Sequence, residues 1–179
     1  MKTQMILLAA AVCTLGLFTA TPAKAASGSG VLLSFNGFMY NQTRETNGGS
    51  SDDNTYIYDI KLGYLNGSGL YFGAIHTTRN HNGSAISGES GSALGASLGY
   101  MGDAGFYLMG HYYLDAKLGD NSKGTGYQGD FGYMGNVSGP FYVGTELTYR
   151  NITYTDRNGG AGNLTVKELF PMLTAAFIF

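Results

Sequence analysis

Three near copies of one short segment constrain the fold of this chain most strongly. GYLNGSGLYFG begins at Gly63, GYMGDAGFYLMG at Gly99 and GYMGNVSGPFYVG at Gly132. In each copy a Gly-Tyr pair runs into a cluster of Gly, Asn or Asp, where positive φ and Asx bonding favour tight reversal, and aromatic and aliphatic residues follow. Each copy therefore predicts a short β-hairpin turn. A hairpin repeated at this spacing indicates a barrel or another radial repeat.

The first residues predict a cleaved targeting segment. Lys2 gives a positive start, an apolar run follows over 5–20, and Ala23-Lys24-Ala25 has the small-x-small pattern of a signal-peptidase site. We expect residues 1–25 to be a signal peptide and residues 26–179 to form the mature domain. An uncleaved anchor is the alternative, but the run is shorter than the ~20 residues that a bilayer helix needs. The single cysteine, Cys13, lies in this segment, so we expect no disulfide in the mature domain.

Charge and aromatic content argue against several classes of protein. Without Lys2 and Lys24, 8 of the 10 basic residues remain against 12 acidic ones, and a net charge near −4 speaks against nucleic acid as a partner. Charged residues make up 12% of the chain, against roughly 25% in ordinary soluble domains. Disorder would require fewer aromatics than the 14 Tyr and 10 Phe found here. Low charge with abundant Tyr and Gly suits a barrel that alternates lipid-facing and lumen-facing side chains.

Eight strands of barrel-spanning length fall between the turns. We predict them at 31–44, 54–66, 70–80, 91–101, 105–117, 125–136, 140–153 and 164–179. The short turns alternate with long polar connections at 45–53, 80–90, 118–124 and 154–163. Outer-membrane barrels have even strand numbers, tight periplasmic turns and longer external loops. The expected fold class is therefore all-β: an eight-stranded antiparallel up-and-down transmembrane β-barrel after a cleaved signal peptide.

Period-2 alternation assigns the two faces of most strands. In the second strand Tyr58, Ile60 and Leu62 share one face, and Asp59 and Lys61 share the other. We expect the apolar faces to meet lipid and tyrosines to form an aromatic girdle near each end of the strands. The tyrosines predicted for the girdle beside the short turns are Tyr64, Tyr71, Tyr100, Tyr107, Tyr133 and Tyr142, and those toward the loops are Tyr40, Tyr56, Tyr112 and Tyr149.

The last strand carries a resemblance to a known family. Its ending, LTAAFIF, places Leu173, Ala175, Phe177 and the terminal Phe179 on one face. This ending resembles the C-terminal assembly signal of bacterial outer-membrane β-barrels, and the whole mature chain resembles the small barrels of the OmpA-domain and OmpX type. The resemblance implies the bacterial cell outer membrane and recognition of the last strand by the barrel-insertion machinery. Pro171 departs from the pattern because proline lacks a ladder donor, and it predicts a bulge or break beside the seam with the first strand.

Ionisable residues on the polar faces predict a network inside the barrel. Its members are Asp59, Lys61, His111, Asp115, Lys117, Asp130, Glu146, Arg150 and Glu168. An eight-stranded barrel is just wide enough for its side chains to fill, and unpaired buried charges are costly. We therefore expect a paired plug. The alternative is a narrow channel along the same residues, which would weakly prefer cations because the acids outnumber the bases.

The residues predict a non-enzymatic protein of the cell envelope, with external loops for envelope stability or surface interaction. The three histidines, His76, His81 and His111, lack a nucleophile-and-acid arrangement and have no ligand spacing with other donors. We therefore expect no catalysis, no metal and no cofactor.

The expected partners are outer-membrane lipid, including lipopolysaccharide, and the barrel-insertion machinery, with the chain a monomer. Arg79, Lys123 and Arg157 are candidates for lipopolysaccharide phosphates, and solvated loop charge is the alternative interpretation. A further alternative is a secreted lipocalin-like ligand-binding barrel with inward apolar faces. Lipocalins typically carry a Gly-x-Trp near the first strand, whereas this chain has no Trp.

Overall fold

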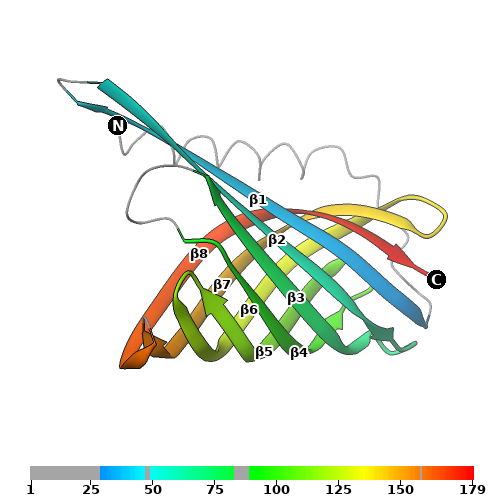
Figure 1. The fold of residues 1–179 in the computed structure, drawn as a ribbon. Helices are drawn as coiled ribbons and strands as arrows, with labels where there is room; N and C mark the ends of the chain where they lie inside the picture. Colours follow the sequence, from blue (N-terminus) through cyan, green and yellow to red (C-terminus); the bar gives the residue numbers. More distant parts are fainter. Residues whose placement is uncertain (1–28, 47–48, 83–88, 158) are drawn as a thin grey trace.

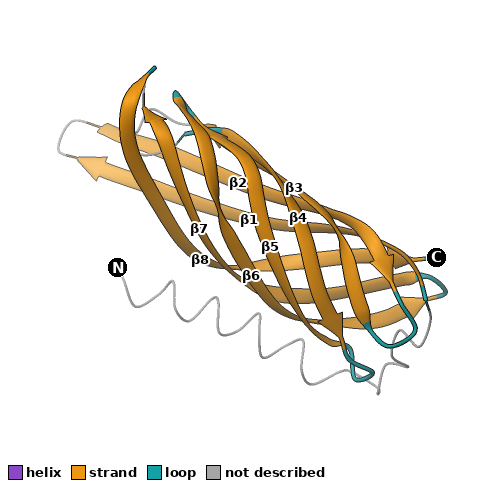
Figure 2. Cartoon of the chain, turned by 90° about the horizontal axis from the view of Figure 1, so that it is seen from below, coloured by secondary structure: helices purple, strands orange, loops and turns teal. Residues whose placement is uncertain are grey.

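The computed structural model describes residues 29–46, 49–82, 89–157 and 159–179, with the backbone alone for 42–46 and 49–53. The predicted signal peptide lies outside these residues. The strands are β1 (Gly30–Thr46), β2 (Gly49–Leu65), β3 (Leu70–Asn82), β4 (Gly91–Met101), β5 (Phe106–Leu118), β6 (Asn121–Ser138), β7 (Phe141–Arg157) and β8 (Gly160–Ile178). Each strand pairs antiparallel with the next and β8 returns to β1, so the sheet closes (Figure 1, Figure 2). The predicted all-β, eight-stranded antiparallel barrel is confirmed.

No helix in the described part of the chain is long and apolar enough to cross a bilayer.

The three repeated segments form short turns, as predicted. At the first, Asn66 Oδ1 accepts hydrogen bonds from the backbone N–H groups of Ser68 and Leu70 at 3.0 and 2.9 Å. Gly69 has φ +85°, and Gly105 has the same φ in the second turn. In the third turn Gly139 has φ +52°. These left-handed positions are where glycine is favoured, so the glycines explain the reversals.

The opposite ends of the strands differ from the prediction. Three segments that were expected to be long loops are mostly strand. Residues 118–124 are strand except for 119–120, residues 154–163 except for 158–159, and residues 45–53 except for 47–48. The β1–β2 hairpin extends well past its neighbours in Figure 1. Of the connection expected at 80–90, residues 80–82 belong to β3, and 83–88 lie outside the described residues. The loop prediction failed because polar residues were interpreted as irregular loops. Backbone hydrogen bonds between strands can continue beyond the apolar wall, with the polar side chains in water.

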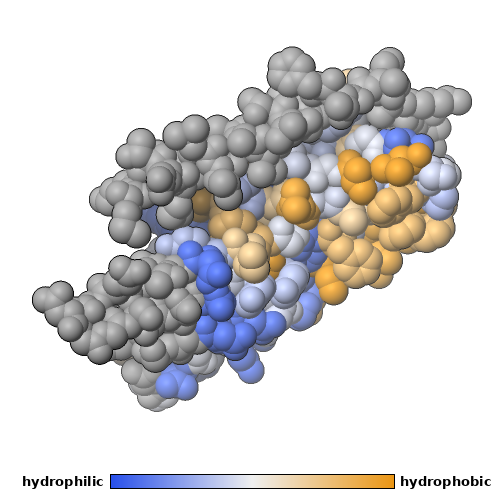
Figure 3. All heavy atoms as spheres, turned by 90° about the horizontal axis from the view of Figure 1, so that it is seen from above, coloured by the Kyte–Doolittle hydropathy of each residue, from blue (hydrophilic) through white to orange (hydrophobic). Residues whose placement is uncertain are grey.

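Side chains alternate between an apolar outer wall and a filled interior. In β2, Leu62 is 53% exposed and Ile60 is 40% exposed, while Asp59 and Lys61 are buried. Figure 3 shows apolar side chains over much of the wall on this face, with hydrophilic ones gathered mainly toward one end. A lipocalin-type barrel needs the reverse arrangement, so the lipocalin alternative is wrong.

Two tyrosines predicted for the turn-side girdle lie inside the barrel. Tyr71 and Tyr107 are buried. They pair across the ladder with the buried residues Leu65 and Met101. Cross-strand partners point to the same side of a sheet, so both hydroxyl groups face the interior.

A β-bulge reverses the alternation near the loop end of β5. Tyr113 opposes Gly95 while Asp115 opposes Leu94, which leaves Leu114 as an extra residue. Ala116 therefore points inward, and Asp115 and Lys117 are exposed. The prediction that Asp115 and Lys117 belong to the internal network was wrong, because one inserted residue moves the following side chains to the other face.

The seam between β1 and β8 is paired over only part of its length. The ladder runs from Leu32↔Ile178 to Gly37↔Leu173 and stops there, whereas β7 pairs with β8 through Pro171 without a register shift. The N–H of Phe179 bonds to Val31 in β1 and the N–H of Ile178 bonds toward β7. The backbone N–H groups of β8 therefore point alternately to β1 and to β7, and the N–H of residue 171 would point to β1. Proline has no N–H to donate there. Of the bulge or break predicted at Pro171, the bulge is absent and the break is found, because the missing donor explains why the seam ladder ends.

Replacing Pro171 with valine should extend this seam. The new backbone N–H would donate to the carbonyl of Met39, its register partner if the ladder continued, and we expect the free energy of unfolding to rise by about 1 kcal/mol. Denaturant unfolding of the folded barrel measures the gain, and hydrogen exchange of the new amide reports the bond. The matched control is Pro140→Val in the β6–β7 turn, which adds no seam bond. A rapidly exchanging amide at residue 171 with unchanged stability would rule out this explanation of the seam.

Candidate functional site

The interior of the barrel is organised around Lys61 of β2. Its Nζ donates to Asp130 Oδ2 of β6 at 2.5 Å and to Glu146 Oε2 of β7 at 2.7 Å. All three side chains are buried. Tyr107 O–H and Asn36 Nδ2 also donate to Glu146, at 2.9 and 2.6 Å. Glu146 therefore has both charged and neutral donors, as a buried ion requires.

A second ion pair lies beside the first. Arg150 Nη2 donates to both oxygens of Asp59, at 3.0 and 3.1 Å. Thr77 O–H donates to Asp59 Oδ1 at 2.7 Å. Gln128 joins the two pairs, because its Nε2 donates to Asp59 at 2.9 Å and to Asp130 at 3.1 Å. Residues from several strands thus meet in one hydrogen-bonded unit across the barrel.

His111 completes the unit and raises the question of catalysis. Its Nδ1 lies 2.7 Å from Ser97 Oγ and its Nε2 lies 2.8 Å from Asp130 Oδ2. A Ser–His–Asp chain activates a nucleophile when substrate can reach the serine. Here Ser97 is 7% exposed, and Asp130 is also held by Lys61. The arrangement is closed to a substrate and acts as structural hydrogen bonding.

The structure brings together six of the nine residues predicted for the network. They are Asp59, Lys61, His111, Asp130, Glu146 and Arg150. Glu168 lies toward the loop end, where its Oε2 is 3.9 Å from Arg150 and its Oε1 pairs with Arg79. Asp115 and Lys117 lie outside. Sequence reasoning missed Asn36, Ser97 and Gln128, whose signal was their place on the inward face of their strands.

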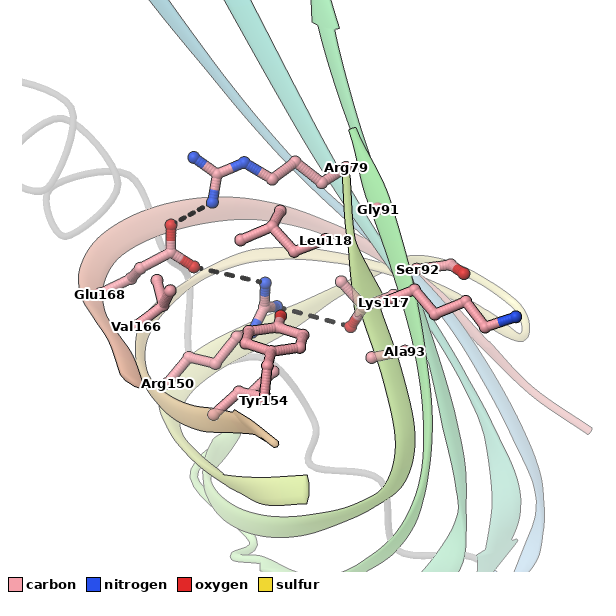
Figure 4. Close-up of a pocket in the computed structure, with 12 residues that line it drawn as sticks. Arg79, Gly91, Ser92, Ala93, Lys117, Leu118, Arg150, Tyr154, Val166 and Glu168 are labelled. Carbon is pink, nitrogen blue, oxygen red and sulfur yellow. Dashed lines mark hydrogen bonds and ion pairs between the residues drawn. The ribbon is translucent and has the colours of Figure 1, made fainter. Parts of the chain in front are cut away.

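Apolar layers close the interior on both sides of the ionic unit. On the turn side lie Leu32, Leu65, Tyr71, Met101, Tyr107, Met109, Met134 and Ala176. On the loop side lie Ile75, Ala93, Tyr113, Ala116, Leu118, Ile152 and Tyr154. A cavity of about 30 Å³ remains beside Arg150 and Glu168, and this is room for one or two waters. Figure 4 shows Arg79 and Arg150 turned toward Glu168 and Lys117 turned away from it.

The four residues of the predicted assembly signal share the outward side of β8. Leu173 and Phe179 are 62% and 69% exposed. Phe177 packs against Phe141 with ring centroids 5.1 Å apart and stacks on Phe179 at 6.0 Å. Ala175 lies between Leu173 and Phe177 and is half-buried. Within the described residues, no group of three or more His, Cys, Asp or Glu side chains has the geometry of a metal site.

The fold and the interior define a class: a closed eight-stranded β-barrel with an apolar wall and an ion-paired core. No family model and no curated protein matches the chain. Among solved structures, it is similar to the solid-state NMR structure of outer membrane protein AlkL in DMPC lipid bilayers, with 15% identity and a TM-score of 0.45. The match covers 90% of this chain and 95% of that one.

Proposed function

We propose that this protein is an integral barrel of the bacterial outer membrane, closed to ions, that acts through its outer wall and its loop-end hairpins. The observation that carries the proposal is the inversion of polarity across the wall. Leu98, Leu108 and Leu147 are 67, 63 and 48% exposed, while two ion pairs are enclosed behind them. In water this exposes large apolar side chains at a cost, whereas in hydrocarbon it is the stable arrangement.

Fractionation tests the location. The protein should remain in the membrane pellet through high salt and carbonate and leave it with detergent. The folded form should also migrate differently from the heated form on a gel, because a closed barrel resists unfolding by detergent. Release by carbonate alone would overturn the membrane proposal.

The second part of the proposal, closure to ions, follows from the filled interior. An ion would have to cross two apolar layers and break the Lys61 or Arg150 pairs. The purified protein inserted in a planar bilayer should therefore give no regular single-channel steps, with heat-modifiable migration as proof of folding. Regular steps that prefer cations would favour the narrow channel instead.

The outward Phe179 and Phe177 support a role for β8 in assembly. They extend the apolar wall along β8, and we propose that the insertion machinery reads them there. No arrangement of the described interior supports an enzyme, since Ser97 and His111 are buried. We propose that the protein is a monomer and that it acts through its outer surface, in envelope stability or surface interaction.

A further inference from the structure

Two neighbouring glycines leave a hollow in the outer wall. Gly110 of β5 and Gly129 of β6 are directly paired and point outward. A Cβ at Gly129 would meet nothing within 4 Å, and one at Gly110 would meet only the carbonyl oxygen of Leu98, at 3.9 Å. Neither residue has positive φ. Neither backbone conformation nor packing requires glycine here, in contrast to Gly124, whose Cβ would press on the Tyr154 ring at 2.7 Å.

The hollow is a shallow groove, wide open on its outer side. Its volume is about 640 Å³. Leu98 of β4 and Tyr149 of β7, the cross-strand partners of the two glycines, form its two lateral walls. Tyr112 and Tyr127 form its wall toward the loop end. We call this hollow the glycine groove; its lining residues are Ala96, Ser97, Leu98, Gly110, His111, Tyr112, Tyr127, Gln128, Gly129 and Tyr149.

Polar groups begin on the loop side of the glycine groove. Asn151 Nδ2 donates to Tyr127 O–H at 3.0 Å. One step further, Thr153 and Thr165 share a hydrogen bond of 2.9 Å. The outward side of β7 thus changes from Leu147 and Tyr149 to Asn151 and Thr153, which is the change expected where hydrocarbon meets headgroups.

Basic side chains lie at this polar step and beyond it. The β5 bulge turns Lys117 outward, Lys123 of β6 is 74% exposed, and Arg157 and Lys167 are exposed on β7 and β8. Among side chains that the structure describes, every exposed Lys or Arg is therefore on β5–β8 or in their hairpins. Asp115, Asp120 and Asp156 lie among them, and Asp156 pairs with Lys123 at 3.4 Å. Glu89 also reaches the β5–β6 hairpin, where it accepts a hydrogen bond from Asn121 at 3.1 Å, so the acidic side chains match the four cations in number.

The spacing of groove and cations fits one amphiphile. Lys123 lies six positions from Gly129 along β6, about 20 Å at ~3.3 Å per residue. Because the strands are tilted by roughly 40° from the membrane normal, Gly129 and Lys123 differ in membrane depth by about 15 Å. A chain lying in the glycine groove would therefore place a headgroup phosphate beside the cations.

We propose that the outer side of β5–β7 is a binding site for a phosphorylated, acylated lipid of the loop-side leaflet, of lipid A chemistry, with one acyl chain in the glycine groove and its phosphate on Lys117 and Lys123. This rests on the proposed membrane location. Arg79, predicted as a phosphate contact, does not contribute, because it pairs with Glu168 inside the barrel mouth.

Native mass spectrometry of the detergent-folded barrel with added lipid A tests the site. Gly129→Leu fills the groove and should weaken lipid A binding at least tenfold, and the double variant Lys117→Gln, Lys123→Gln should weaken it by a similar factor. The matched control is Gly37→Leu on β1, an outward glycine whose Cβ would make only ordinary contact with Tyr58, at 3.8 Å. It should bind like the wild type.

Three results would overturn the inference: no lipid A adduct on the wild type, equal binding of neutral phosphatidylethanolamine, or equal loss in Gly37→Leu. Carbonate extraction and heat-modifiable migration are measured on the same preparations. A barrel that passes both tests but binds no lipid A refutes this site alone, whereas a carbonate-soluble protein refutes the membrane location.

Discussion

Replacing Lys61 with methionine is expected to lower the free energy of unfolding by about 3–5 kcal/mol, because removing one member of a buried ion pair leaves charge uncompensated. Asp130 and Glu146 would both lose their cation, and each is almost fully buried. The hydrogen bonds from Tyr107 and Asn36 satisfy Glu146 as an acceptor but do not cancel its charge. Denaturant unfolding of the barrel in lipid, followed by gel migration, measures the loss.

Two comparisons isolate the charge. The triple variant Lys61→Met, Asp130→Asn, Glu146→Gln removes the stranded carboxylates and should recover a large part of the loss. Lys123→Met removes the cation of the exposed pair with Asp156, and such pairs contribute about 0–1 kcal/mol. Similar losses for Lys61→Met and Lys123→Met would show that the internal network does not hold the barrel together.

Replacing Leu147 with arginine is expected to cost about 2–4 kcal/mol in a bilayer, since an outward cation near the midplane must leave water. Leu147 is 48% exposed on β7, between Phe141 at the turn end and Asn151 at the polar step. The interior is untouched by this change. Reversible unfolding from lipid vesicles measures the cost.

Thr155→Arg is the matched control on the same strand and the same side. Thr155 is exposed beyond the polar step, where the cost of an arginine falls to about 0–1 kcal/mol. The difference between the two variants therefore reports depth. Equal, small effects at both positions would mean that the wall faces water.

Much of the barrel could be predicted because local chemistry and global fold agree in its turn-side half. The glycines and Asn66 specify reversals wherever they occur, and in β2 the apolar side chains alternate strictly with Asp59 and Lys61. Beyond the polar step the alternation is reversed, so that apolar side chains point inward and polar ones point outward. Ile152 and Tyr154 point inward while Thr153 and Thr155 point outward, because water replaces hydrocarbon there and apolar groups have only the interior left.

That change explains the errors at the loop end. Asp115 and Lys117 lie beyond the apolar wall, where charged side chains point outward into water, and the bulge at Leu114 turns them to that side. A one-residue insertion of this kind cannot be recognised from a period-2 sequence pattern. The internal charges were recognised because a charge on a strand is rare. Ser97 and Gln128 were not, because they carry no charge, and their place on the inward face of their strands was the only signal.

The most direct test of an apolar wall facing hydrocarbon around an enclosed ionic core uses spin labels on single cysteines at Leu62, Leu108 and Leu147. Cys13, the single cysteine of the chain, is first replaced with serine, and a label at Asp120 in the β5–β6 hairpin serves as the water-exposed reference. In lipid vesicles the three wall labels should collide more often with dissolved oxygen than with a water-soluble nickel chelate, and the label at Asp120 should do the reverse. Wall labels that favour the nickel chelate would contradict the membrane-embedded barrel.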